Sequence, residues 1–144
     1  PDKYGRTPLD LSCKLRSTPI VEALLKNGVK VNEGDQYGNT ALKKVIMDFT
    51  GDYRVSEKEK KSTLDIIDLL LKNGAEINVR DKSGRTPLAH ILKEVNPKNQ
   101  QKVLDIVPEL MKRGALTDIK DNENKSPADY ASASGISEIK EMVR

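Results

Sequence analysis

A motif that returns four times along the chain constrains its fold more than any other feature of the sequence. Each copy begins with Asp, then two variable residues and a Gly or Asn, and ends in Thr-Pro-Leu or a close variant; the first residues are Asp2, Asp35, Asp81 and Asp121. The first spacing is 33 residues, and the later spacings of 46 and 40 imply insertions of about 13 and about 7 residues. Self-similarity at such a period is the signature of a repeat architecture.

A second motif closes three of the repeats, and together the two motifs predict turn, helix, turn, helix. Leu-Leu-Lys-Asn-Gly, with Asn four residues after the Gly, recurs around Gly28 and Gly74, and a variant surrounds Gly114. Thr or Ser before Pro or Ala is typical of a helix N-cap; these caps are Thr7, Thr40, Thr86 and Ser126. Apolar pairs four residues apart, as in Ile66-Ile67 and Leu70-Leu71, predict amphipathic second helices.

Paired in this order, the motifs resemble those of the ankyrin repeat family from Asp2 to Arg144. The resemblance implies an all-α ankyrin-repeat solenoid of stacked antiparallel helix pairs with short β-turn or hairpin connections. It implies one domain over residues 1–144, with repeats at about 2–34, 35–80, 81–120 and a partial one at 121–144. The family's His after Thr-Pro-Leu is missing; its positions hold Asp10, Lys43, Ala89 and Asp129.

The insertions in the second and third repeats are the individual features of this chain. Thr50-Gly51-Asp52-Tyr53 reads as a break, and Ser56 with Glu59 forms a capping box that predicts one helix over Glu57–Lys72. The charged first half of that helix should project into solvent. In the third repeat, Pro108 either kinks a helix over Gln100–Lys112 or lies in its first turn.

Composition argues against catalysis and metal binding. The chain has one Cys, Cys13, and one His, His90, which leaves no disulfide framework, no Cys-based zinc site and no His-rich site. We expect the Cys13 side chain to be buried and structural, and the His90 side chain to be partly exposed. No phosphate-binding Gly-rich loop, signal peptide or membrane-spanning run is found. We therefore expect no catalytic residue, no metal, no cofactor and no enzyme activity, and an intracellular location, cytoplasmic or nuclear.

The resemblance implies a binding surface on the turn tips and the concave face of the first helices. The corresponding positions are Lys3, Tyr4, Arg6, Lys14, Gln36, Tyr37, Asn39, Met47, Lys82, Ser83, Arg85 and Lys93. Tyr4 and Tyr37 occupy the same position in adjacent turns, and aromatic and Arg side chains are typical of interface centres. An alternative is that the Tyr rings only pack on the adjacent turn. Net charges of +2 and +3 on the first and third repeats favour a partner with an acidic segment.

The leading hypothesis is a non-catalytic protein-binding module that is monomeric alone and binds neither nucleic acid nor membrane. The net charge of +3 is too small to imply nucleic acid. Irregular ankyrin arrays resemble those of pathogen host-interaction proteins, so an effector acting on host proteins in the host cytoplasm is one interpretation. A targeting or substrate-recruiting fragment of a longer enzyme and a structural spacer are the alternatives.

Overall fold

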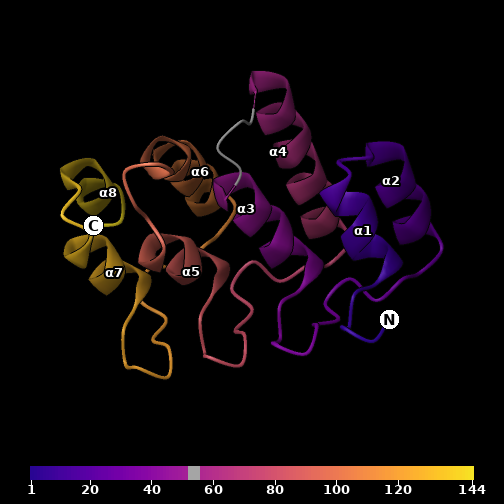
Figure 1. Cartoon of the computed structure of the whole chain (residues 1–144), viewed down its shortest axis with the longest axis horizontal. Helices are drawn as coiled ribbons and strands as arrows, with labels where there is room; N and C mark the ends of the chain where they lie inside the picture. Colours follow the sequence, from indigo (N-terminus) through magenta and orange to yellow (C-terminus); the bar gives the residue numbers. More distant parts are fainter. Residues whose placement is uncertain (52–55) are drawn as a thin grey trace. The chain divides into compact units, whose positions relative to one another are not determined.

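Helices dominate the computed structural model of the chain, which describes residues 1–51 and 56–144. Within those ranges there are eight helices and no strand (Figure 1). In chain order they are α1 (Pro8–Lys14), α2 (Thr18–Lys26), α3 (Ala41–Gly51), α4 (Glu57–Lys72), α5 (Pro87–Lys93), α6 (Gln100–Lys112), α7 (Pro127–Ala133) and α8 (Ser137–Met142). The predicted all-α fold, with turns between helix pairs, is confirmed.

The predicted caps set where the first helices begin. Thr7, Thr86 and Ser126 are N-caps whose side-chain oxygens accept hydrogen bonds from the backbone N–H three residues later. Each of these helices begins with Pro, which loses no helical hydrogen bond at that position. In the fourth turn Asn124 replaces Gly and adopts a φ of 61°, a left-handed conformation that Asn tolerates better than most residues.

The inserted helix of the second repeat has the predicted bounds. Ser56 Oγ accepts a hydrogen bond from Glu59 N–H at 3.3 Å, and Glu59 Oε2 accepts one from Ser56 N–H at 2.6 Å. The first turn of α4 is largely solvent-exposed, whereas Ile66, Ile67 and Leu70 in its second half are fully buried. The capping box therefore begins a helix whose first turn lies largely in solvent and which packs into the core from Thr63 onward.

Two details of the insertions differ from expectation. Thr50 and Gly51 belong to α3, because burial of Phe49 and Thr50 carries the helix past the predicted break; Asp52 and Tyr53 lie outside the described residues. Pro108 is the ninth residue of α6, so its alternative placement in the first turn is wrong. The helix continues through Pro108 because Val107 and Leu110 beside it are buried.

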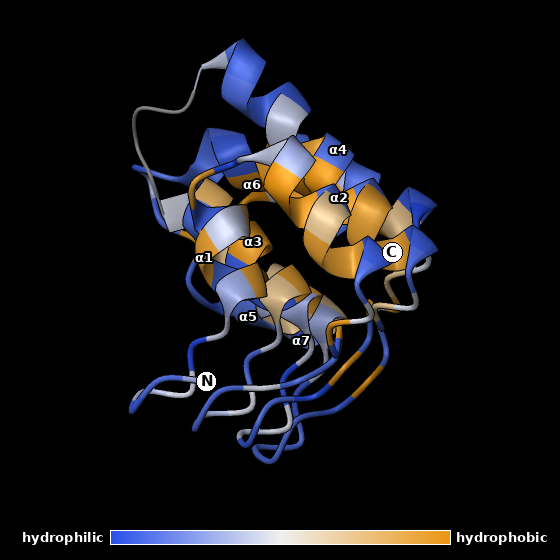
Figure 2. Ribbon diagram, turned by 90° about the vertical axis from the view of Figure 1, so that its right-hand side faces the viewer, coloured by the Kyte–Doolittle hydropathy of each residue, from blue (hydrophilic) through white to orange (hydrophobic). Residues whose placement is uncertain are grey.

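The described residues form two compact units. The N-terminal unit holds Pro1–Phe49 and residues 56–76; the C-terminal unit holds residues 50–51 and Ile77–Arg144. In the N-terminal unit α2 packs against both α1 and α4, around a core that includes Val21 and Ile66. In the C-terminal unit α5 packs against α6 and α7, and α8 packs against α6 and α7. The helices carry the hydrophobic positions, whereas the turns are mainly hydrophilic (Figure 2).

Candidate protein-binding site

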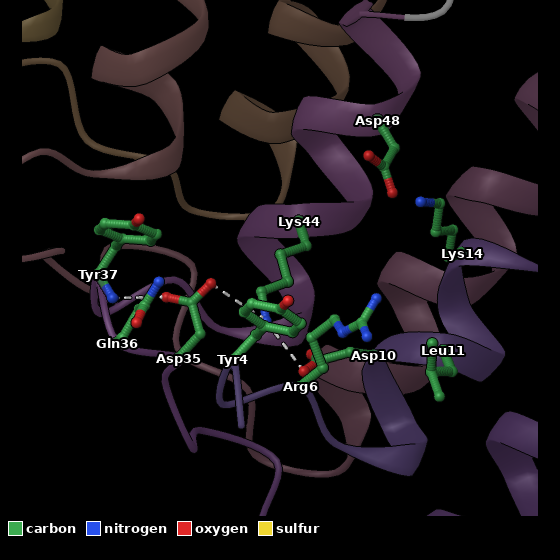
Figure 3. A pocket seen from close by; sticks show the side chains of 10 residues that line it. All are labelled: Tyr4, Arg6, Asp10, Leu11, Lys14, Asp35, Gln36, Tyr37, Lys44 and Asp48. Atoms are coloured by element: carbon green, nitrogen blue, oxygen red, sulfur yellow. Dashed lines mark hydrogen bonds and ion pairs between the residues drawn. The ribbon is translucent and has the colours of Figure 1, made fainter. Parts of the chain in front are cut away.

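A groove of about 410 Å³ lies in the N-terminal unit between the first two turns and helices α1 and α3 (Figure 3). Its lining residues are Tyr4, Arg6, Asp10, Leu11, Lys14, Asp35, Gln36, Tyr37, Lys44 and Asp48. Five of them are residues that the sequence predicts as partner contacts: Tyr4, Arg6, Lys14, Gln36 and Tyr37. Three further predicted contacts in this unit, Lys3, Asn39 and Met47, lie outside the lining. The groove therefore gathers the predicted surface of the first two repeats only in part.

The two turn tips are held in the same way by the Asp that opens each motif. Asp2 Oδ1 accepts hydrogen bonds from the backbone N–H groups of Tyr4 and Arg6, both at 2.9 Å. Asp35 Oδ1 accepts from Tyr37 N–H at 2.9 Å and from Asn39 N–H at 3.0 Å. Because the same two bonds form in both turns, Tyr4 and Tyr37 are presented in equivalent positions.

Both tyrosines present much of their surface to solvent. Tyr4 is 50% exposed and Tyr37 is 62% exposed, so neither ring is buried by the adjacent turn. The Lys3 ammonium lies 4.9 Å from the centroid of the Tyr4 ring, and the Arg6 guanidinium carbon lies 5.3 Å from it. These are cation–π distances, and they limit the freedom of the Tyr4 side chain before any partner binds.

Lys44 ties α3 to the first helix and to the second turn. Its ammonium lies 2.9 Å from Asp10 Oδ2 and 3.4 Å from Asp35 Oδ2. Burial alone would raise the pKa of Asp35, but the backbone N–H groups of Asn39 and Tyr37 and the Lys44 ammonium hold it below its usual value. The pair with Asp10 links the first two repeats without the inter-turn His of the family. No local sequence pattern marks Lys44, because its partners come together only in the folded chain.

The far end of the groove is bordered by α1 and the second half of α3. In Figure 3 the side chains of Lys14 and Asp48 point toward each other across it. Leu11, on the same side of α1, is 48% exposed and adds an apolar wall. The groove thus combines two aromatic rings, an aliphatic side chain and charges of both signs.

The predicted contacts of the C-terminal unit take part in bonds between its own turns. Asn122 donates from its backbone N–H to Ser83 O and from Nδ2 to Lys82 O, each at 3.0 Å. Arg85 pairs with Glu123 and, at 3.3 Å, with Asp121, and its side chain is only 17% exposed. Arg85 therefore stabilises the junction between the third and fourth turns.

A buried carboxylate organises that junction. Tyr130 Oη donates to Asp121 Oδ2 at 2.5 Å, and Lys93 Nζ lies 2.8 Å from Glu123 Oε1. Burial would raise the pKa of Asp121, yet hydrogen bonds from Tyr130, from the backbone of Lys125 and Glu123 and from Arg85 lower it. The pKa of Lys93 is raised by its hydrogen bond to Glu123. Lys93 is thus engaged within the unit, on its exposed edge.

The described residues offer little for bond-making chemistry. Cys13 is buried, and burial raises the pKa of its thiol to about 12, with the Asp10 charge adding to the effect. His90 is half-buried. Within residues 1–51 and 56–144, no group of three or more His, Cys, Asp or Glu side chains is placed to hold a metal ion. Among those same residues, no helix has the length and apolar character needed to cross a membrane.

The ankyrin repeat family model matches residues 4–33, which contain the second half of the first turn, α1 and α2. A search of curated proteins found no match to the chain. The first repeat of the chain thus matches the ankyrin repeat family, and the all-helical fold, repeated turn geometry and repeated caps of the described residues agree with that family. Ankyrin repeats mediate protein–protein interactions and are typically non-catalytic modules.

Proposed function

We propose that this chain acts as one non-catalytic ankyrin-repeat domain, which binds a segment of a partner protein in the groove of its N-terminal unit. The observation that carries the proposal is the pair of exposed tyrosines at equivalent positions on either side of the first inter-turn junction. Tyr gives a large contact area at a low entropic cost and is enriched at the centres of interfaces. Their turns are fixed by the Asp2 and Asp35 hydrogen bonds, which lowers the cost of ordering on binding.

Two exposed cations at the border of the groove favour a partner segment with carboxylates. Lys44 pairs with both Asp10 and Asp35, so its single positive charge is shared by two of the three carboxylates in the lining. Arg6, which pairs with Asp2 at 2.7 Å, and Lys14 have exposed side chains at the border of the groove. Electrostatic complementarity of this kind sets the rate and orientation of association more than its affinity. The free thiol of Cys13 suits a reducing, intracellular compartment for this interaction.

Selection of a random peptide library displayed on phage, against the immobilised chain, tests the proposal. We expect enriched peptides with apolar and acidic residues, whose affinity falls by at least about 30-fold in the double variant Tyr4→Ala, Tyr37→Ala. Ile20→Ala is the matched control, because Ile20 is half exposed in the same unit but lies outside the groove. Peptides that bind the double variant as tightly as the wild type would overturn the proposal.

A further inference from the structure

A second groove of the N-terminal unit follows the line along which α2 packs against α4 (Figure 2). It consists of two adjoining cavities of about 370 and about 280 Å³, which share Glu22, Leu69 and Lys72 in their linings. Thr18, Asp65 and Asp68 complete the first cavity, and Leu25, Lys26 and Asn73 complete the second. None of these residues lines the groove that presents the two tyrosines. This α2–α4 groove is therefore a separate surface.

The two helices run in the same direction along the α2–α4 groove. Thr18, the first residue of α2, lies in the first cavity with Asp65. Lys26, the last residue of α2, lies in the second cavity with Asn73, the C-cap of α4. From Thr18 to Lys26 the chain rises by about 12 Å. The groove therefore has the length of about two helical turns.

The walls of the α2–α4 groove suit a helical partner better than an extended one. Between the ends of the two helices, the backbone groups are bonded within each helix, so the walls offer a partner only side chains. An extended segment docks by hydrogen bonds from its backbone to a free edge, whereas a helix brings a backbone that is already bonded. Leu25 and Leu69 are half-buried and form the apolar part of the lining. A helix can place apolar side chains at i and i+4 against them.

The two ends of the α2–α4 groove differ in charge. The first cavity has three carboxylates and one ammonium group, whereas the second has one carboxylate and two ammonium groups. Asp65 pairs with Lys61, with 3.1 Å between Oδ2 and Nζ. Within the part of the chain that the structure describes, Glu22, Lys26 and Lys72 form no ion pair. Their charges are therefore available to a partner.

We propose that the α2–α4 groove binds an α-helix of a partner protein, which lies antiparallel to α2. This helix carries Asp or Glu in its first turn, where they meet Lys26 and Lys72. It carries Lys or Arg in its last turn, where they meet Glu22 and the other carboxylates of the first cavity. Its apolar side chains at i and i+4 contact Leu25 and Leu69. A helix of this kind has its charges where its own macrodipole favours them, whereas a parallel helix would need the opposite arrangement.

Two series of peptides of about 14 residues, held helical by a lactam bridge on the outward face, test the proposal. The matched series has Glu in the first turn, Lys in the last turn, and Leu, Met or Phe at i and i+4. The exchanged series has the two charged ends swapped, so its net charge is the same. In fluorescence anisotropy at low ionic strength, we expect the best matched peptide to bind at least about tenfold more tightly than its exchanged counterpart.

Substitutions in the full chain then locate the contact. Glu22→Lys should weaken binding of the best matched peptide at least about fivefold, because Glu22 faces its basic end. Glu33→Lys is the matched control, since it changes the net charge equally and Glu33 is exposed outside the α2–α4 groove. It should change the affinity less than about twofold. The double variant Tyr4→Ala, Tyr37→Ala should bind this peptide as the wild type does, because both tyrosines lie in the other groove.

The proposal is supported if the matched series is preferred, if Glu22→Lys removes that preference and if both control proteins keep it. It is overturned if no matched peptide binds more tightly than its exchanged counterpart. Equal effects of Glu22→Lys and Glu33→Lys, or loss of binding in the double tyrosine variant, would overturn it as well.

Discussion

The reactivity of Cys13 is set by its surroundings in the N-terminal unit. It is only 4% exposed, and its thiol keeps its proton because burial raises its pKa from 9.0 to about 12. We therefore predict that a thiol reagent at pH 8 reacts with Cys13 far more slowly in the native chain than in urea. Equal rates in the two states would contradict the buried position of the thiol.

The same shift predicts how stability depends on alkaline pH. The folded pKa of Cys13 lies above the unfolded value, so its contribution is fully present below about pH 9 and is lost as the pH rises toward 12. Cys13→Ala should therefore lose less stability than the wild type between pH 8 and pH 10, measured by urea unfolding. Parallel pH dependence in the two proteins would rule out this titration.

The residues whose roles could be predicted from the sequence are those whose interactions involve near neighbours in the chain. Thr7 and Ser126 precede Pro, and their cap hydrogen bonds involve residues only three positions away. Lys44 was missed because its partner Asp10 is 34 residues away, and no local pattern marks such a pair. The burial of Lys43 beside it was missed for a different reason, because a charged side chain gives no sequence signal of burial.

At the level of elements, α4 depends on a cap that lies at the start of the insertion. Ser56→Ala removes the acceptor for Glu59 N–H, and this should lower the free energy of unfolding by about 1 kcal/mol. Ser62→Ala is the control within α4, because Ser62 Oγ donates to Lys58 O inside the helix and caps nothing. Equal stability losses in the two variants would argue against the capping role of Ser56.

For the interior proline of α6 we predict that substitution raises stability, whereas substitution of the α4 cap lowers it. Pro108 has no N–H, so Leu104 O cannot receive the helical hydrogen bond expected from position 108. Pro108→Ala should restore that bond and raise the free energy of unfolding by about 1 kcal/mol or more. Pro97→Ala, in the exposed segment before α6, should give no increase. A loss of stability in Pro108→Ala would show that the helix needs the shape that Pro imposes.

The bounds of α4 followed from its capping box, whereas the end of α3 did not follow from its sequence. Gly51 suggested a break, but burial of Phe49 and Thr50 outweighs the modest helix preference lost at Thr and Gly. Pro108 is a similar case, in which tertiary packing overrides a local signal. Such outcomes depend on contacts with other elements, which a repeat pattern alone does not specify.

At the level of the whole molecule, carboxylates in the turns make stability sensitive to acid. The pKa values of Asp2, Asp35 and Asp121 are lowered in the folded chain. A lowered folded pKa contributes stability above the unfolded value of about 4, and this contribution is lost as the pH falls through the folded pKa. We therefore expect the free energy of unfolding to fall as the pH is lowered below about 4.

Asp121 should account for part of this acid sensitivity. Asp121→Asn should be less stable than the wild type at pH 7, and its stability should change less between pH 5 and pH 3. Asp118→Asn is the matched control, since Asp118 is exposed. If the stability of Asp121→Asn fell with pH as much as that of the wild type, the buried network around Asp121 would not be the source of the acid sensitivity.

The location of the binding site is tested most directly by amide hydrogen exchange over the whole chain, with and without a peptide selected as described above. We predict that binding slows exchange in residues 2–8 and 35–41, the two turns that present Tyr4 and Tyr37, and in α1. Exchange in the exposed first turn of α4 should stay unchanged. Protection confined to α4, with none in the first two turns, would contradict the groove as the binding site.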